Sequence, residues 1–277
     1  MLSPLVSFII PFFNSGETIQ ETIDSIFNQS YENFDVWIIN DGSTEINAIE
    51  KLKEFESNPQ INILHQENEG PSIARNNAIK KSNAKYIIPL DADDKITEHA
   101  IKNGLPFLLE NENLGVVYGN LNYFGVENYL KIQEPFEINK QILWNQVAIC
   151  CLIKKEVFES VGYYDEYLSK LGLEDWEFWI RVYEQGWHFK EMDETLFEIR
   201  MNANSRTFQV ANKNIDAIKD YVYKKHAVIL AKEFNNLFYA FKMLKETPDF
   251  RVGNWILSPY RMIKNKLKKM SEYKMKS

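Results

Sequence analysis

Residues 86–94, with the sequence YIIPLDADD, join a short apolar run to three carboxylates. The run Tyr86 to Leu90 is typical of a buried strand, and Asp91, Asp93 and Asp94 follow at its carboxyl end. Carboxylates this close repel one another, and a nearby cation favours their ionised form. Oxygen ligands completed by water and phosphate favour Mg²⁺ or Mn²⁺ over zinc, so the segment predicts a divalent-metal site. Taken alone, it is equally compatible with a solvated acidic turn that caps a helix over Lys95–Glu110.

Outward from this segment, short apolar runs alternate with stretches of helical period. This alternation is typical of a mostly parallel sheet covered by helices. A helix over residues 16–28 would present Ile19, Ile23, Ile26 and Phe27 on one face. The expected strands of the first half are Leu5–Pro11, Phe34–Asn40, Ile61–His65 and Tyr86–Leu90, with further helices over residues 46–55 and from Ser72.

The rhythm changes after residue 113. We expect a strand over residues 115–122, an irregular aromatic segment over residues 123–144, a helix over residues 173–185 and a strand over residues 189–200. After about residue 208 the pattern is helical. The sequence therefore predicts an α/β catalytic part over residues 1–207, with a nucleotide-binding half 1–113 and an acceptor half 114–207, and a C-terminal helical extension over residues 208–277.

Charge is unevenly distributed along the 277 residues. The net charge is −7, but residues 254–277 carry seven Lys or Arg and one Glu, which leaves −13 for residues 1–253. The acidic body argues against a nucleic-acid partner. Apolar residues recur at helical spacing among the cations of the tail, which predicts a basic amphipathic helix suited to an anionic membrane surface. Packing on the acidic body or a dimer contact are the alternatives.

The two cysteines, Cys150 and Cys151, are adjacent and unsuited to a bridge with each other. No run of about 18 apolar residues and no secretion signal is present. We therefore expect both cysteines to be reduced and inert. The expected location is the cytoplasm, where the protein could also be bound peripherally to the inner face of a membrane.

Polar clusters follow all four strands of the first half. They are residues 11–14 (PFFN), 40–44 (NDGST), 68–70 (NEG) and 91–94 (DADD). Ligands of open α/β sheets bind beyond the carboxyl ends of the strands, so these clusters predict one cleft for a nucleotide with metal-bound phosphates. Asp41 taken alone would indicate only a turn, because Asp followed by Gly is common in turns.

These clusters, together with Ala74-Arg75-Asn76 and the pair Glu174-Asp175, resemble the ordered signature of the family 2 glycosyltransferases. Members of this family are inverting enzymes of GT-A fold, a Rossmann-like sheet flanked by helices. The resemblance covers about residues 4–206. It implies a transfer of a sugar from a nucleotide-diphosphate sugar with the help of Mg²⁺ or Mn²⁺.

The resemblance also implies a role for each matching position. Asp175 matches the catalytic base and Asp93 the metal-holding carboxylate. The matches for donor binding are Pro11, Phe13, Asn14, Asp41, Arg75 and Asp91, with Asp41 at a uracil-type base. Two positions depart from the family pattern: Asn40 stands in place of a second aspartate, and Asn202 in place of a frequent histidine.

The residues themselves are compatible with these roles. Inversion needs a base on the face of the sugar opposite the leaving diphosphate. Glu174 and the neighbouring tryptophans would raise the pKa of Asp175, while the start of a helix would lower it. An acidic first turn is the plain structural alternative. We assign acceptor contacts to Trp144, Glu174 and Trp176, because aromatic faces commonly bind sugar rings.

The sequence thus predicts an inverting, metal-dependent glycosyltransferase that uses a UDP-type donor and a carbohydrate or lipid-linked acceptor in surface polysaccharide or lipopolysaccharide assembly. A noncatalytic nucleotide-sugar or glycan-binding protein with the same fold is the alternative. A sugar nucleotidyltransferase is a further one, but its glycine-rich basic loop after the first strand is missing from residues 11–17.

Overall fold

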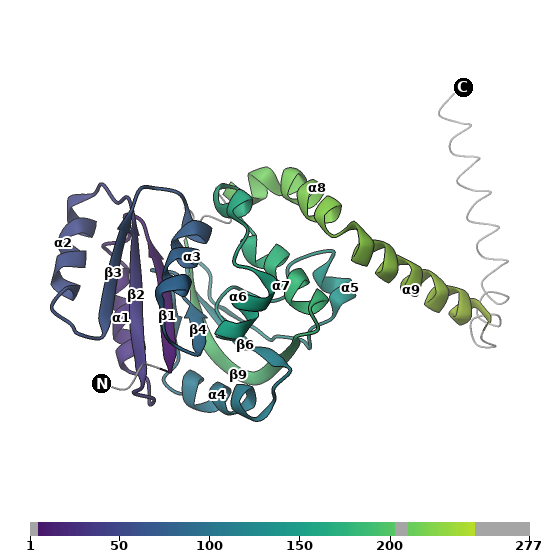
Figure 1. Ribbon diagram of the computed structural model, residues 1–277, viewed down its shortest axis with the longest axis horizontal. Coiled ribbons are helices and arrows are strands. Elements are labelled where there is room, and N and C mark those ends of the chain that lie inside the picture. Colours follow the sequence, from purple (N-terminus) through teal and green to yellow (C-terminus); the bar gives the residue numbers. More distant parts are fainter. Residues whose placement is uncertain (1–4, 203–209, 247–277) are drawn as a thin grey trace, which may run out of the picture. The chain divides into compact units, whose positions relative to one another are not determined.

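The computed structural model describes residues 5–202 and 210–246 (Figure 1). The chain divides into two compact units, Met1–His226 and Ala227–Ser277. The basic tail predicted over residues 254–277 lies outside the described residues. Within the described part, no helix has the length and apolar character needed to cross a bilayer.

The first half of the chain forms four parallel strands in the order β3-β2-β1-β4. A helix follows each of the first three strands and returns the chain to the end of the sheet where the next parallel strand begins, as expected for crossover connections. The elements are β1 (Val6–Phe12), α1 (Ile19–Phe27), β2 (Phe34–Asp41), α2 (Ile46–Phe55), β3 (Ile61–Gln66), α3 (Pro71–Lys81) and β4 (Tyr86–Pro89).

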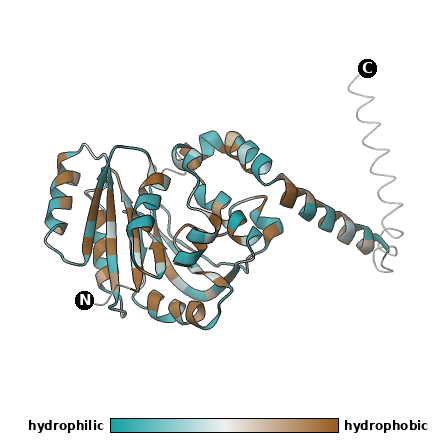
Figure 2. Ribbon diagram, viewed as in Figure 1, coloured by the Kyte–Doolittle hydropathy of each residue, from teal (hydrophilic) through white to brown (hydrophobic). Residues whose placement is uncertain are grey.

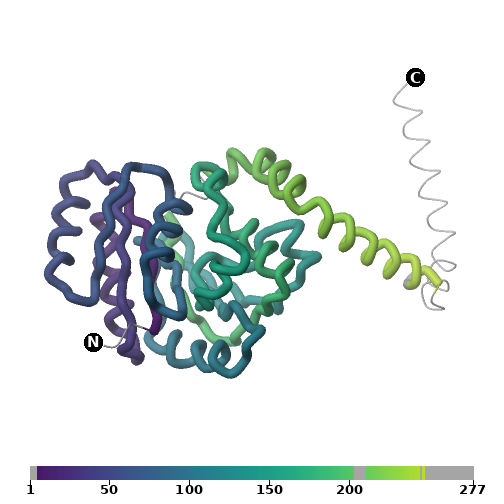
Figure 3. Tube along the Cα trace, in the orientation of Figure 1, coloured from purple at the N-terminus to yellow at the C-terminus, as the bar shows by residue number. Residues whose placement is uncertain are grey.

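The second half extends the same sheet. β8 pairs antiparallel with both β4 and β6, and the long strand β9 runs parallel to β6. Figure 3 traces the chain from the purple and blue first half into the teal and green second half. The full order is β3-β2-β1-β4-β8-β6-β9-β5, with β7 paired to β6. The elements of the second half are β5 (Lys95–Ile96), α4 (Ala100–Glu110), β6 (Leu114–Gly125), β7 (Tyr129–Lys131), α5 (Ile138–Gln141), β8 (Leu152–Lys154), α6 (Lys155–Val161), the 3-10 helix η1 (Glu166–Lys170), α7 (Glu174–Glu184), β9 (His188–Met201), the 3-10 helix η3 (Asn212–Asn214) and α8 (Ile215–Lys225).

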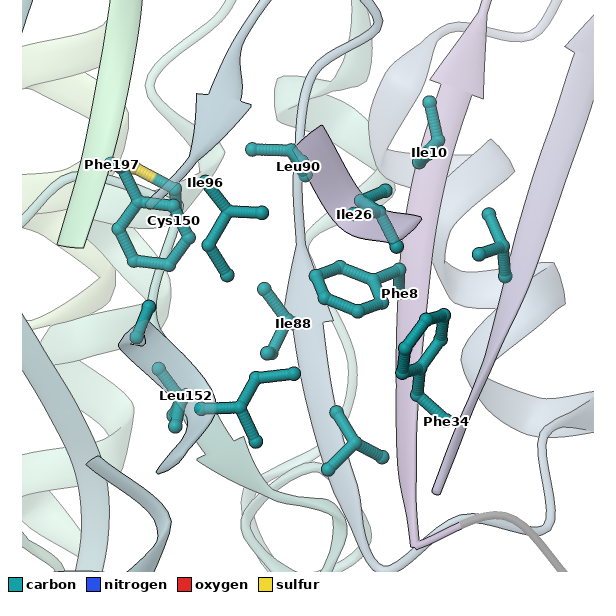
Figure 4. Packing of buried hydrophobic residues seen from close by; sticks show 14 of the residues in the cluster. Phe8, Ile10, Ile26, Phe34, Ile88, Leu90, Ile96, Cys150, Leu152 and Phe197 are labelled. Atoms are coloured by element: carbon teal, nitrogen blue, oxygen red, sulfur yellow. The ribbon is translucent and has the colours of Figure 1, made fainter. Parts of the chain in front are cut away.

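The sheet buries a hydrophobic cluster on each face. Alternate residues of β1 divide between them: Phe8 and Ile10 join the cluster that includes α1 and α4, and Ile9 joins the cluster that includes α3 and α7. Figure 4 shows Phe8 beside Phe34, whose rings meet edge to face at 5.6 Å. Figure 2 shows hydrophobic residues recurring on strands and helices alike. Burial on both faces explains the continuous apolar runs of the sequence.

Two of the predictions from sequence are wrong in detail. The helix expected from Lys95 begins only at Ala100, because residues 95 and 96 pair as β5 with Glu198 and Phe197 of β9. The segment 123–144, expected to be irregular, contains β7, α5 and the end of β6. Both cysteines are free and buried, as expected.

The helix α9 (Ala227–Glu246) is the described part of the second unit. It exposes large apolar side chains, among them Phe234 (68%), Phe238 (55%) and Phe241 (51%). These three positions recur at helical spacing and therefore share one face of the helix.

Candidate active site

A cleft of about 840 Å³ opens at the carboxyl ends of the parallel strands. It is the place where open α/β sheets bind ligands. Eight of the eleven candidate residues line it, although they come from distant parts of the sequence. They are Pro11, Phe13, Asp41, Arg75, Asp91, Asp93, Glu174 and Asp175. The remaining three, Asn14, Trp144 and Trp176, are not among the lining residues.

Asp41 at the end of β2 organises one wall of the cleft. Its Oδ1 accepts hydrogen bonds from Gln66 Nε2 at 2.8 Å and the backbone N–H of Glu69 at 2.9 Å, and its Oδ2 accepts one from the N–H of Gly70 at 2.9 Å. Asp41 is buried, so these donors balance its charge. The carboxylate thereby fixes the turn before α3, and contact with a nucleoside base stays a prediction.

Asn14 joins the ends of β1 and β2. Its backbone has a φ of 52°, and its Oδ1 accepts hydrogen bonds from the N–H groups of Thr44 (2.9 Å) and Glu45 (3.1 Å). Asn tolerates this left-handed conformation better than most residues. Asn14 therefore holds the loop after β2 in place and does not line the cleft itself. Its neighbour Phe13 lines the cleft and is 47% exposed.

The acidic cluster after β4 divides its carboxylates between different partners. Asp91 pairs with Nη2 of the buried Arg75. Asp94 is buried and accepts the backbone N–H of Arg200 at 2.8 Å; burial and its acidic neighbours raise its pKa well above the usual value. Asp93 lies between them, and burial followed by the charge of Asp91 raises its pKa to about 6.

Arg75 and Arg200 supply positive charge to the cleft. Besides Asp91, Arg75 contacts Glu174, with its Nη1 2.7 Å from Oε1. Arg200 donates from Nε to the carbonyl of Asp93 at 3.1 Å and pairs with Glu21 at 2.7 Å. Both guanidinium groups are paired with carboxylates here, so a phosphate group, which guanidinium groups bind readily, would have to share or replace these pairs.

Asp175 stands in the first turn of α7, facing the cleft from the second half of the chain. Burial, and then the charge of Glu174, raises its pKa to about 7. Hydrogen bonds from Asn145 Nδ2 (2.7 Å) and the N–H of Trp176 (2.9 Å) act in the opposite direction. A carboxylate that titrates near neutral pH inside a cleft is suited to proton transfer.

The three acceptor candidates have different surroundings. Glu174 is buried and lines the cleft beside Arg75. Trp144 is 54% exposed and immediately precedes Asn145, the partner of Asp175. Trp176 is 1% exposed, and its ring N–H donates to the carbonyl of Gln141. The assignment of Trp176 to acceptor contact is therefore corrected: its indole belongs to the core, because it has no accessible face.

The surroundings of Asp93 fit a hard divalent cation. The buried Asn202 Oδ1 has no hydrogen-bond partner among the described residues, and its Nδ2 lies 3.4 Å from Asp93 Oδ2. Carboxylate and amide oxygens are the donors that Mg²⁺ and Mn²⁺ accept, with water and phosphate completing the shell. No group of three His, Cys, Asp or Glu in the described ranges is arranged to hold a metal by itself, so ligand oxygens would have to contribute.

Several lining residues were missed by the reading of the sequence. They are Ser15, Pro71, Ile149, Ser169, Lys170, Gly172, Leu173, Ile199, Arg200, Val210 and Ala211. Arg200 and Lys170 are single cations outside any motif, so only their position in the fold reveals them. Asn145, which does not line the cleft but bonds Asp175, had no signal beyond its place next to Trp144.

Comparison with known proteins places this arrangement in a wider group. The model of the family described as "Glycosyl transferase family 2" matches residues 7–162. An uncharacterized glycosyltransferase of Rickettsia bellii is 30% identical over 214 residues, which are 75% of this chain and 30% of that protein. The chondroitin synthase of Pasteurella multocida is 37% identical over 116 residues, 42% of this chain and 12% of that protein. The chain thus spans about a third of the length of the Rickettsia relatives, between 30% and 35%.

Solved structures share the fold. The Staphylococcus aureus protein TarS, residues 1–349, in complex with UDP-GlcNAc, superposes with a TM-score of 0.63 at 17% sequence identity. The superposition covers 74% of this chain and 61% of that one. At this identity the likeness concerns the GT-A architecture, a mostly parallel sheet flanked by helices.

Proposed function

Because this chain belongs to glycosyl transferase family 2, we propose that it transfers a sugar, with inversion, from a UDP-type donor to a carbohydrate or lipid-linked acceptor. The observation that carries the proposal is that Asp175, with its pKa raised to about 7, lines the same cleft as the acidic cluster and the arginines. The complex of TarS with UDP-GlcNAc supports a donor of the UDP class.

Asp175 acts as the general base. Its ionised carboxylate takes the proton of the acceptor hydroxyl as that oxygen forms a bond to the anomeric carbon, while the nucleoside diphosphate leaves from the opposite face. Asp41, Phe13 and Pro11 hold the nucleoside end of the donor, and Arg75 lies deeper beneath Asp91. Arg200 stabilises the negative charge of the diphosphate.

Asp93 would hold a Mg²⁺ or Mn²⁺ ion, and Asn202 Oδ1 would supply a second oxygen donor. When bound, such an ion neutralises the negative charge of a diphosphate and orients it. The acidic residues of this chain then have complementary tasks: Asp93 serves the donor and Asp175 serves the acceptor.

The direct test measures transfer and donor binding separately. Wild-type protein is incubated with UDP-, GDP-, dTDP- and CMP-sugars in the presence of Mn²⁺, and donor binding is followed by thermal shift. The donor that stabilises the protein is then used with acceptor candidates. We expect Asp175→Asn to abolish transfer and to retain donor affinity, because the amide cannot take a proton.

The matched control is Glu191→Gln, which replaces a carboxylate by an amide at a partly exposed position outside the cleft. We expect it to leave transfer and binding unchanged. Donor binding without turnover, unaffected by Asp175→Asn, would instead identify a nucleotide-sugar or glycan-binding protein. Stabilisation by none of the nucleotides in the presence of Mn²⁺ would refute the proposal.

The acceptor belongs to surface polysaccharide or lipopolysaccharide assembly in this proposal. Two of the relatives are named chondroitin synthase and hyaluronan synthase, names of polysaccharide-forming enzymes. Trp144 presents an exposed aromatic face beside the residue that bonds Asp175, and we expect it to contact the acceptor sugar. Trp144→Ala should raise the KM for acceptor and leave the KM for donor unchanged.

The basic tail attaches the chain to the cytoplasmic face of an anionic membrane. Residues 254–277 carry a net charge of +6, and each cation near an anionic surface contributes about 1 kcal/mol. The exposed apolar face of α9, with Phe234, Phe238 and Phe241, precedes this tail in the chain. Buried apolar area and attraction of cations to anionic lipids both strengthen attachment to a membrane interface.

Co-sedimentation with vesicles tests the attachment. We expect binding to phosphatidylglycerol-rich vesicles and weak binding to phosphatidylcholine vesicles. Replacement of Lys264, Lys268 and Lys269 by Glu should abolish the difference, whereas the same change at the exposed body residues Lys53 and Lys102 should not. Equal binding of wild type and tail variant would contradict the role of the tail.

A further inference from the structure

Asn145 lies in the loop between α5 and β8, and its side chain donates a hydrogen bond to Asp175. Its Nδ2 is 2.7 Å from Asp175 Oδ2, and the backbone N–H of Trp176 is 2.9 Å from Asp175 Oδ1. Each carboxylate oxygen of Asp175 therefore accepts one hydrogen bond, and the plane of the carboxylate is fixed at both ends.

The orientation of the Asn145 amide is determined by Gln141, which is fully buried. Gln141 Oε1 accepts the backbone N–H of Gln146 at 2.9 Å, and Gln141 Nε2 donates to the carbonyl of Trp176 at 3.2 Å. A backbone N–H can only donate and a carbonyl can only accept, so the Gln141 amide has one possible orientation. Its Nε2 then donates to Asn145 Oδ1 at 3.1 Å, which leaves Asn145 Nδ2 to face Asp175.

We propose that Asn145, oriented by Gln141, is a positioning residue for Asp175: it holds the carboxylate in one rotamer and favours its ionised form. The inference rests on the proposed role of Asp175 as the base. The loop after α5 thereby gains a function beyond the acceptor contact that we expected of Trp144.

Other groups around Asp175 act in both directions. Burial and the charge of Glu174 favour the protonated acid, whereas Asn145, the N–H of Trp176 and the charge of Arg75 favour the carboxylate. Burial raises the pKa of both Cys151 and Tyr164, which keeps these two groups neutral at pH 7. The remaining facing groups from neighbouring strands are Tyr123 of β6 and Lys131 of β7.

The experiment measures the titration of Asp175 directly, by ¹³C NMR of protein labelled at the aspartate carboxyl carbon. The Asp175 signal is assigned by its loss in Asp175→Asn. A charge-assisted hydrogen bond corresponds to about one pKa unit, so we expect the midpoint to move up by about one unit in Asn145→Ala. Starting from a pKa of about 7, the ionised fraction at pH 7 falls from about one half to about one tenth.

The kinetic counterpart is a pH profile of kcat/KM. We expect the kcat/KM of Asn145→Ala to be about fivefold below that of wild type at pH 7. At pH 9 the two values should converge, because Asp175 is then ionised in both proteins. The matched control is Gln146→Ala, which removes a side-chain hydrogen bond of the same loop, to the N–H of Glu137 at 3.1 Å, and leaves the contact with Asp175. It should shift neither the titration nor the profile.

Asn145→Asp is the second variant, because it preserves the shape of the side chain. It replaces the donor by a like charge, so its upward shift should exceed that of Asn145→Ala. An unchanged Asp175 midpoint in a folded Asn145 variant would overturn the inference, even if activity fell. Failure of the proposed function has a different signature, since an inactive wild type would still give the NMR titration.

Discussion

Replacement of Glu177 by Gln tests how the structure supports the helix that carries Asp175. Glu177 lies two residues after Asp175 in the first turn of α7, has no exposed surface, and contacts two cationic side chains and a histidine. The distances are 2.8 Å to Arg181 Nη2, 2.9 Å to Lys225 Nζ and 3.1 Å to His226 Nε2. Lys225 is the last residue of α8 and His226 follows it, so the change removes a buried charge that joins the end of α8 to α7.

The magnitude follows from the pKa of Glu177. Burial alone would raise it, but the hydrogen bonds from His226 and Arg181 and the nearby cations lower it from 4.5 to about 2. The difference between these two pKa values corresponds to about 3 kcal/mol of folding free energy. Because the folded pKa is depressed, this contribution is complete above pH 4.5 and is lost as the pH falls toward 2.

Urea unfolding followed by tryptophan fluorescence measures this difference. We expect Glu177→Gln to lower the free energy of unfolding by about 3 kcal/mol at pH 7 and by about 2 kcal/mol at pH 3.5. Glu54→Gln is the control, because the pair of Glu54 with Lys51 is exposed and should contribute under about 1 kcal/mol. A loss below about 1 kcal/mol at pH 7, or a loss that grows toward acid, would refute the reasoning.

Three further predictions concern the cleft and its turn. Transfer by the wild type should rise with pH through a midpoint of about 7, because only ionised Asp175 accepts a proton, and a flat kcat/KM profile from pH 5 to 9 would contradict this role. Gly70→Ala should lower the stability of the protein to urea more than Gly186→Ala. Both glycines have a positive φ, which costs an alanine about 1–2 kcal/mol. Only at Gly70 would the added Cβ also meet a neighbour, because Ser169 Oγ would lie 2.6 Å from it. Equal losses would show that the close approach to Ser169 is relieved at no cost. Treatment with EDTA should abolish transfer and weaken UDP binding in calorimetry, with recovery on addition of Mn²⁺; undiminished transfer in EDTA would remove Asp93 from its proposed role.

The first half of the fold could be read from the sequence because its signals are local. β1, β2 and β3 begin and end within one residue of the expected strands. β1 is the clearest case, because its burial on both faces leaves a continuous apolar run. Lys95 and Ile96 could not be placed in the same way. Their strand exists through pairing with Glu198 and Phe197, about a hundred residues away, and no local pattern encodes that contact.

The candidate site divides along similar lines. Asp91, Asp93 and Asp175 stand in motifs, and the structure brings them to one cleft. Arg200 and Asn145 are isolated residues whose neighbours are set by the pairing of β9 and by the loop after α5. Trp176 shows the opposite error: an aromatic beside the proposed base suggested ligand contact, but its indole is buried in the packing between α5 and α7.

Arg75 has a consequence for how such a protein can change. A single buried guanidinium contacts Asp91, a proposed donor-binding residue, and Glu174 next to the proposed base, and its charge favours the ionised form of Asp175. A substitution at Asp91 that adapts the cleft to another sugar nucleotide would also alter the field at Asp175. Under the proposed function, a substitution that changes the preferred donor would therefore also change the optimal pH. Laboratory evolution toward a new donor should then select compensating changes near Glu174.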